Sequence, residues 1–200
     1  MHEVPCPGRR NNSAKYRGRC VFLELLDCYA VPFDLRQTER AIWALKTTPI
    51  GGSDAVSAEN TRMKSVCATS VREGKPMQVV ARAVVRKYVE QDRIVFISRM
   101  LVEPIQELFA VAFRETTRLV LKRGKPSATG PTTVVQTHCR AMDHETLSRG
   151  QAQCGFASWK KTPYYDSGVR AWGNSIADFN QRVEDMLVRE SILPRVNGSW

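Results

Sequence analysis

Two runs rich in β-branched residues lie close together in the middle of the chain. The first covers Met77 to Val89, the second covers Arg93 to Leu101, and only the polar residues 90–92 separate them. A compact polar turn between two such runs predicts an antiparallel hairpin. Because side chains alternate along a strand, one face is expected to carry the following residues: Met77, Val79, Ala81, Ala83, Val85, Ile94, Phe96, Ser98 and Met100. Val95, Ile97 and Leu101 share the other face with Arg99, so we expect both faces of the sheet to be covered.

An amphipathic pattern near the C-terminus predicts a helix from about Ser175 to about Glu190. Apolar residues recur there at helical spacing and form one stripe: Ile176, Phe179, Val183, Met186 and Leu187. Ser175 and Asp178 have the spacing of a capping box, with Asp in place of the usual Glu, and Pro194 ends the helix. The stripe needs an apolar surface to pack on, and the concave face of the sheet would provide it.

The N-terminal half predicts a strand followed by a helix. The run Val21–Val31 is mostly apolar and ends at a proline, which favours a strand. Residues 33–47 are expected to be helical, capped by Asp34 or, if the helix begins later, by Thr38. Residues 48–62 are expected to form a loop.

Two further strands are predicted at residues 117–123 and 132–140, joined by a turn region rich in glycine and proline. Residues 141–173 are polar and are expected to be rich in turns. This segregation of strands and helices predicts an α+β fold. We expect one domain over residues 20–193, a flexible basic tail at 1–19 and a short C-terminal tail at 194–200.

The formal net charge of +10 in 200 residues bears on partners and location. Such a charge favours nucleic acid, an anionic membrane surface or an acidic protein as a partner, although it is spread along the chain as in a protein that is merely basic. Trp159-Lys160-Lys161 and Tyr164-Tyr165 mix aromatic and basic residues, a mixture that suits single-stranded nucleic acid or a membrane surface and also occurs in solvated loops. Without a visible secretory signal or membrane-spanning segment, we expect a cytoplasmic or nuclear protein.

Several separated stretches of the chain together resemble the StAR-related lipid-transfer (START-like) domain, in the divergent form of oomycete mating-specific proteins. The stretches that carry the resemblance are Val21–Asp27, Val31–Asp34, Thr38–Trp43, Val84–Phe96, Glu115–Leu121 and Phe179–Glu190. Segments 102–114 and 141–172 depart from the family pattern, and Ser98 stands where such proteins tend to place an aromatic residue.

The resemblance implies a helix-grip fold, in which a curved antiparallel sheet packs around the long C-terminal helix with an apolar cavity between them. It also implies non-catalytic binding of a lipid or another hydrophobic ligand. The residues expected to line the cavity are Val85, Phe96, Ser98, Phe179, Val183 and Met186. Arg86 and Arg99 are candidates for contact with an anion or an acidic headgroup, although arginines on this hairpin can equally pair with surface acids.

No catalytic motif stands out in the sequence, which lacks a glycine-rich phosphate loop, an HExxH motif and a GxSxG motif. His138, Cys139, His144 and Cys154 are the nearest approach to a zinc site or a thiol–imidazole pair. Their spacing is irregular, and the neighbours His138 and Cys139 would point to opposite faces of a strand. We therefore expect no metal, no cofactor and no enzymatic activity. The competing hypothesis is a basic interaction module that contacts nucleic acid or an acidic protein and has no ligand cavity.

Overall fold

The computed structural model describes residues 13–15, 21–48, 55–72, 75–104, 112–128, 130–143 and 165–192. Its elements are β1 (Ser13–Lys15), β2 (Val21–Val31), α1 (Leu35–Thr47), β3 (Ala55–Ala58), β4 (Thr61–Arg72), β5 (Lys75–Val89), β6 (Arg93–Pro104), β7 (Phe113–Arg123), β8 (Thr133–Asp143) and α3 (Tyr165–Ile192).

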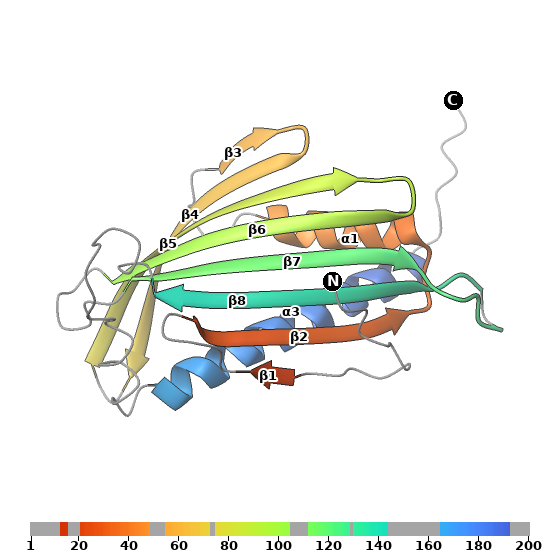
Figure 1. Cartoon of the computed structure of the whole chain (residues 1–200). Coiled ribbons are helices and arrows are strands. Elements are labelled where there is room, and N and C mark those ends of the chain that lie inside the picture. Colours follow the sequence, from red (N-terminus) through yellow and green to blue (C-terminus); the bar gives the residue numbers. More distant parts are fainter. Residues whose placement is uncertain are drawn as a thin grey trace.

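The strands form one curved antiparallel sheet in the order β1-β2-β8-β7-β6-β5-β4-β3 (Figure 1). Strands that follow one another in the chain are neighbours from β3 to β8, and β8 then returns to pair with β2. Both described helices lie on the same side of the sheet, which we call the inner face; the opposite side is the outer face (Figure 1). The predicted α+β class, with a curved antiparallel sheet against a long C-terminal helix, is confirmed.

The predicted hairpin is β5 and β6. Val89 pairs with Ile94, and the Glu90 amide donates a hydrogen bond of 2.9 Å to the Arg93 carbonyl across the turn. The Arg93 guanidinium also lies 2.6 Å from the Glu90 carboxylate. The register places Val85 opposite Ser98 and Ala83 opposite Met100, so the predicted faces of the hairpin are confirmed.

Helix α1 begins at Leu35, two residues later than predicted, and Asp34 is its cap as the sequence predicts. The Asp34 carboxylate accepts hydrogen bonds from the amides of Arg36 and Gln37, at 2.8 and 2.9 Å. The Gln37 side chain accepts a bond from the Asp34 amide in return, which completes a capping box. The cap fixes the entry of the helix directly after β2, so α1 runs back across the inner face.

Several boundaries differ from the sequence expectation; β6 continues to Pro104 and β7 begins at Phe113, for example. The predicted loop at 48–62 contains β3 and the first residues of β4, and β4 as a whole was not predicted. The predicted turn-rich stretch at 141–173 is wrong at both ends, because β8 continues to Asp143 and α3 begins at Tyr165. Ser175 therefore lies inside α3 and is not its cap. The two glycines at 168 and 173 weaken a helix by about 1 kcal/mol each without ending it.

The segment predicted as an N-terminal tail contributes one short strand. β1 pairs with β2 in antiparallel register, with Ala14 opposite Leu25. Thus the prediction of a flexible tail is wrong at these three residues, and the rest of the segment lies outside the described residues. The predicted tail at 194–200 lies outside them as well.

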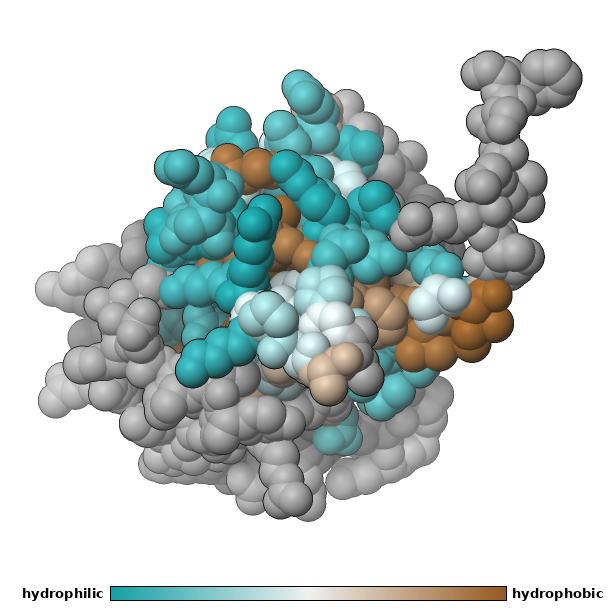
Figure 2. All heavy atoms as spheres, turned by 90° about the vertical axis from the view of Figure 1, so that its right-hand side faces the viewer, coloured by the Kyte–Doolittle hydropathy of each residue, from teal (hydrophilic) through white to brown (hydrophobic). Residues whose placement is uncertain are grey.

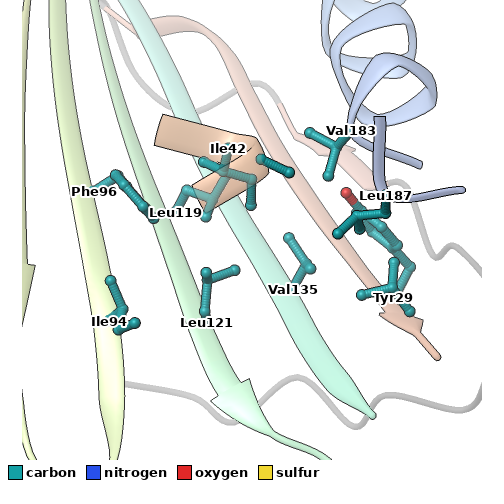
Figure 3. Close-up of a cluster of buried hydrophobic side chains, with 11 residues drawn as sticks. Tyr29, Ile42, Ile94, Phe96, Leu119, Leu121, Val135, Val183 and Leu187 are labelled. Carbon is teal, nitrogen blue, oxygen red and sulfur yellow. The ribbon is translucent and has the colours of Figure 1, made fainter. Parts of the chain in front are cut away.

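The hydrophobic core fills the space between the inner face, α1 and α3 (Figure 3). Ile42 of α1 points toward Phe96 and Leu119, whereas Val183 and Leu187 of α3 point toward Tyr29 and Val135 (Figure 3). The fully buried members of this cluster include Ile42, Phe96, Leu119, Leu121, Val135, Val183 and Leu187. The prediction that the α3 stripe packs on the sheet is confirmed, since Phe179 and Met186 also pack against this cluster.

A buried polar group fixes α3 against β2. The Asn180 amide donates to the Asp27 carboxylate, and the Tyr29 hydroxyl donates to the Asn180 side-chain oxygen at 3.2 Å. Asn180 and Asp27 are both buried. Burial of polar groups costs free energy unless they are bonded, so this contact defines one position for the helix along the strand.

Candidate polar site at the end of α1

The inner face is divided by the end of α1. The last turn of this helix reaches the row of the sheet that contains Ser98, because Lys46 Nζ donates to Ser98 Oγ at 3.3 Å. On one side of this row the side chains belong to the buried core cluster; we call this the packed half.

The other side of the row, which we call the open half, extends beyond the end of α1. Its apolar side chains on β5, β6 and β7 are Ala81, Ala83, Met100, Val102 and Phe113. All five remain partly exposed, whereas the inner-face residues of β6 and β7 in the packed half, Ile94, Phe96, Leu119 and Leu121, are buried. The contrast is confined to these central strands, because Val89 of β5 is 52% exposed in the packed half and Ala141 of β8 is buried in the open half. Apolar side chains that face the interior and stay partly exposed are surface available to a hydrophobic ligand.

A polar cluster marks the boundary between the two halves. Register places Ser98, Thr117 and Cys139 next to one another on β6, β7 and β8. The Thr117 hydroxyl donates to the Glu115 carboxylate at 2.8 Å. Lys46 stands over this row, with its Nζ 4.7 Å from the centroid of the Phe179 ring. The cluster thus joins α1, three strands and α3.

Burial changes the protonation of this cluster. Removal from water lowers the pKa of Lys46 to about 8; the nearby Glu115 carboxylate opposes this shift and the Lys64 ammonium adds to it. Burial, with a further contribution from the charge of Glu115, raises the pKa of the Cys139 thiol to about 12. Cys139 is therefore a neutral thiol at physiological pH and a poor nucleophile.

A second row, one step into the open half, adds charged groups. Lys64 of β4 faces the inner side, because it lies opposite Ala83, which in turn lies opposite Met100. Burial and then the positive charge of Arg182 on α3 lower the pKa of Lys64. Lys46, Lys64 and Arg182 are thus close enough for each ammonium or guanidinium to act on its neighbour.

The six residues predicted to line a cavity all come from the inner face or from α3, but they do not play one role. Phe96 and Val183 are fully buried and Val85 is nearly so, which makes them core residues. Ser98 and Phe179 are partly exposed and contact Lys46, at the boundary of the open half. Met186 is also partly exposed and packs against the core cluster.

Arg86 and Arg99 lie on the outer face. The expectation that they contact a ligand on the inner side of the sheet is therefore wrong. Arg86 pairs in register with Ile97 and Arg99 with Val84, and both side chains are exposed. Arg86 lies over the ring of Tyr88 at 5.7 Å. Strand alternation puts the whole sheet between these guanidiniums and the open half.

The residues considered for a metal site do not converge in the described part of the chain. His138 is on the outer face, where its Nε2 lies 2.8 Å from the Glu24 carboxylate, whereas Cys139 is buried on the inner face. Their opposite orientation is as predicted, and His144 and Cys154 lie outside the described residues. Within those residues, no three His, Cys, Asp or Glu side chains gather where they could hold a metal ion.

The sheet and the helix ends also carry two surface depressions. One, of about 420 Å³, is lined mostly by outer-face residues, and it also touches Lys64, Ala83 and Met100 of the same strands; the outer-face residues include Met63, Arg82, Val84, Arg99, Leu101 and Arg114. The other, of about 300 Å³, is at the end of the molecule where α1 begins, between Leu35, Ile94 and Pro131. Figure 2 views this end of the molecule, where hydrophobic areas lie at the surface among hydrophilic ones.

Sequence interpretation singles out Ser98 and Cys139 of the polar cluster but not Lys46, Thr117 or Glu115. Lys46 is typical of the last turn of any helix, where cations are favoured by the helix dipole. A usable signal existed at Glu115, which alternates in phase with the buried Leu119 and Leu121 on β7. A carboxylate on the buried phase of a strand indicates a polar site in the interior. The aromatic and basic motif at 159–165 lies almost wholly outside the described residues.

Comparison with known proteins leaves the chain without a family. No protein-family model matches the sequence, and no curated protein matches it. A putative uncharacterized protein from Rhizobium leguminosarum is similar in structure with 13% identity over 90% of this chain and 99% of that one, at a TM-score of 0.43. The Mll3558 protein from Rhizobium loti is similar with 11% identity over 82% of this chain and 95% of that one, at a TM-score of 0.42. These values assign neither a family nor a function.

Neither α1 nor α3, the helices of the described ranges, could cross a bilayer.

Proposed function

We propose that this protein binds a lipid or another hydrophobic molecule in the open half of the inner face, without transforming it. The observation that carries the proposal is the contrast between the two halves along β6 and β7: their inner-face apolar side chains are buried beside α1 and partly exposed beyond its end. Helix α3 and the sheet would form the walls. This is also what the START-like resemblance of the sequence implies.

The chemistry of the polar cluster supports binding over catalysis. The Cys139 thiol stays protonated, because its pKa is raised to about 12. Lys46 and Ser98 contact each other and could orient a polar group of the ligand by hydrogen bonding. A few polar groups beside apolar surface are typical of sites that recognise an amphipathic small molecule.

The test is to fill the open half and measure the binding of a fluorescent fatty-acid probe. Ala83→Trp places a large ring on the inner face between Lys64 and Met100. We expect affinity to fall about tenfold or more, which corresponds to a loss of about 1.4 kcal/mol. Its matched control is Val84→Trp, on the same strand and on the outer face.

Both variants must first be shown to melt cooperatively, because overpacking typically costs about 1–3 kcal/mol. Equal loss of binding in both variants, or unchanged binding in Ala83→Trp, would contradict a ligand in the open half. Native mass spectrometry of the purified wild-type chain gives an independent check, with a hydrophobic adduct as the expected result.

A second candidate function follows from the outer face. Four arginines from three strands are exposed there, and they are Arg82, Arg86, Arg99 and Arg140. Arg99 and Arg140 flank Thr116 in one row, about 10 Å apart at the strand spacing of about 4.8 Å. Guanidiniums bind phosphate in a bidentate way, so this surface suits a nucleic acid.

Single-stranded DNA binding at several salt concentrations tests this candidate. If the row binds phosphates, replacing Arg99 and Arg140 by Gln should make the salt dependence shallower by about 0.7 for each phosphate that is no longer neutralised. An unchanged slope would exclude the row as a nucleic-acid interface. Binding of an acidic polypeptide in place of DNA would make the face a protein interface.

A further inference from the structure

The open half carries more positive charge than the described residues neutralise. Lys46 of α1 lies over its boundary row, Lys64 of β4 faces it, and the charge of the exposed Arg182 on α3 acts on Lys64. Among the described side chains, neither Lys64 nor Arg182 has a carboxylate within ion-pair distance. By contrast, the nearby Lys87 is paired with Glu39 at 2.7 Å.

This arrangement costs free energy in the absence of a counter-charge. Lys46 and Lys64 are partly removed from water, and like charges face them. Because desolvation disfavours a charged group, an unpaired buried cation is normally neutralised or bound to an anion. Glu115 supplies one negative charge beside Lys46, against three cations.

We propose that the ligand of the open half is an amphiphile with an anionic head, a carboxylate or a phosphate, held by Lys46, Lys64 and Arg182. The hydrocarbon part would then lie along Ala81, Ala83 and Val102, deeper in the open half. This inference rests on the proposed function and specifies the chemical class of its ligand. It moves the anion contact from Arg86 and Arg99, on the outer face, to three cations on the inner side.

The geometry favours an anion on a chain over a free ion. Lys64, Ala83 and Met100 lie in one row across β4, β5 and β6, with Ala83 between the other two. Phe179 lies under the Lys46 ammonium, at 4.7 Å. A head held by these cations is therefore in contact with apolar side chains on either side, which suits the first carbons of an alkyl chain.

The experiment compares a fluorescent long-chain fatty acid with its methyl ester, which has the same chain and no charge. We expect the wild-type protein to bind the acid about tenfold more tightly than the ester, the size of one charge-assisted hydrogen bond. Lys64→Gln and Arg182→Gln should each reduce this ratio severalfold and leave ester binding unchanged. Arg99→Gln removes the same charge from the outer face and should leave the ratio as it is.

The possible outcomes distinguish a failure of the anionic headgroup site from a failure of the proposed hydrophobic binding. If the ester binds and the wild-type ratio is close to one, the anion site is wrong and the hydrophobic site stands. If neither probe binds, the proposed function fails. If inorganic phosphate alone raises the melting temperature as much as the fatty acid does, the three cations hold a free anion and the amphiphile is wrong. Arg182 is exposed on α3, so its substitution tests the charge without disturbing the core.

Discussion

At the scale of single residues, Lys46 is the side chain whose position is hardest to explain by stability alone. Its ammonium lies over the Phe179 ring and next to Ser98, in a place where an apolar side chain would pack without desolvating a charge. Residues that lower stability in a defined interior position are commonly retained for binding. Lys46 therefore offers a direct test of a trade between stability and ligand recognition.

We predict that Lys46→Met makes the ligand-free protein more stable, by about 1–3 kcal/mol at neutral pH. The pKa of Lys46 falls from 10.5 to about 8 on folding, so between these values the unfolded chain binds more protons than the folded chain. The contribution of Lys46 to stability therefore rises with pH across this interval. The gap between variant and wild type should close as the pH rises from about 8 to about 10.5, measured by urea unfolding at each pH.

The groups that face Lys46 set the conditions of this experiment. Glu115, Lys64 and Cys139 all act on it, and the raised pKa of Cys139 makes its own contribution fall above about pH 9. Comparing variant with wild type at the same pH largely cancels that contribution. Lys125→Met, at an exposed position, is the control and should show no such gap. A lower stability of Lys46→Met at every pH would show that the lysine is a stabilising core residue.

At the scale of elements, α3 is held by one face, and the two sides of the helix should respond differently to truncation. Leu187 is fully buried and the next residue, Val188, is 46% exposed. We predict that Leu187→Ala costs about 2–5 kcal/mol of unfolding free energy and that Val188→Ala changes it by no more than about 0.5 kcal/mol. Chemical denaturation of both variants measures the difference. Similar costs at the two positions would mean that α3 is rotated from the orientation described here.

Elements with a strong periodic pattern could be predicted from sequence, and those without one could not. The β5–β6 hairpin and the α3 stripe follow from regular spacing of apolar residues, and α1 follows from Asp34. β4 was missed because its inward positions include Arg62 and Lys64, which break the alternation expected of a half-buried strand. β4 forms a strand because it pairs with β5 along its whole length, and its own sequence pattern does not indicate one. Lys64 faces the open half, whereas Arg62 lies in the boundary row, with its guanidinium 5.5 Å from the centroid of the Trp43 ring.

Long-range contacts were equally hidden from local patterns. Asn180 is a polar residue beside the stripe of α3, and only the return of the helix to β2 reveals its partners Asp27 and Tyr29. By contrast, the placement of Arg99 was available from alternation alone, since it is the direct neighbour of Ser98 on one strand. A headgroup role for Arg99 and a cavity role for Ser98 were therefore incompatible from the outset.

At the scale of the whole molecule, the two faces of the sheet differ in chemistry. The inner face combines the buried core with the open half and three cations, whereas the outer face displays arginines between apolar side chains. With a net charge of +10, both faces attract anions, and a single binding measurement would not tell them apart. A method that reports the position of the ligand along the chain is needed.

Hydrogen exchange measured by mass spectrometry distinguishes the two faces. Without ligand, we predict the strongest protection in β7 and its neighbours β6 and β8, which are hydrogen-bonded on both sides in the middle of the sheet, and weak protection in β3 at its edge. Addition of the fatty-acid probe should slow exchange around the end of α1 and in the parts of β4, β5 and β6 that hold Lys64, Ala83 and Met100. Ligands that bind only the native state stabilise the segments they contact against local opening. Lys64→Gln should reduce this added protection at the same probe concentration, and Arg99→Gln should not. Added protection confined to the start of α1, near Leu35, would place the ligand in the depression at that end and contradict the open half as its site.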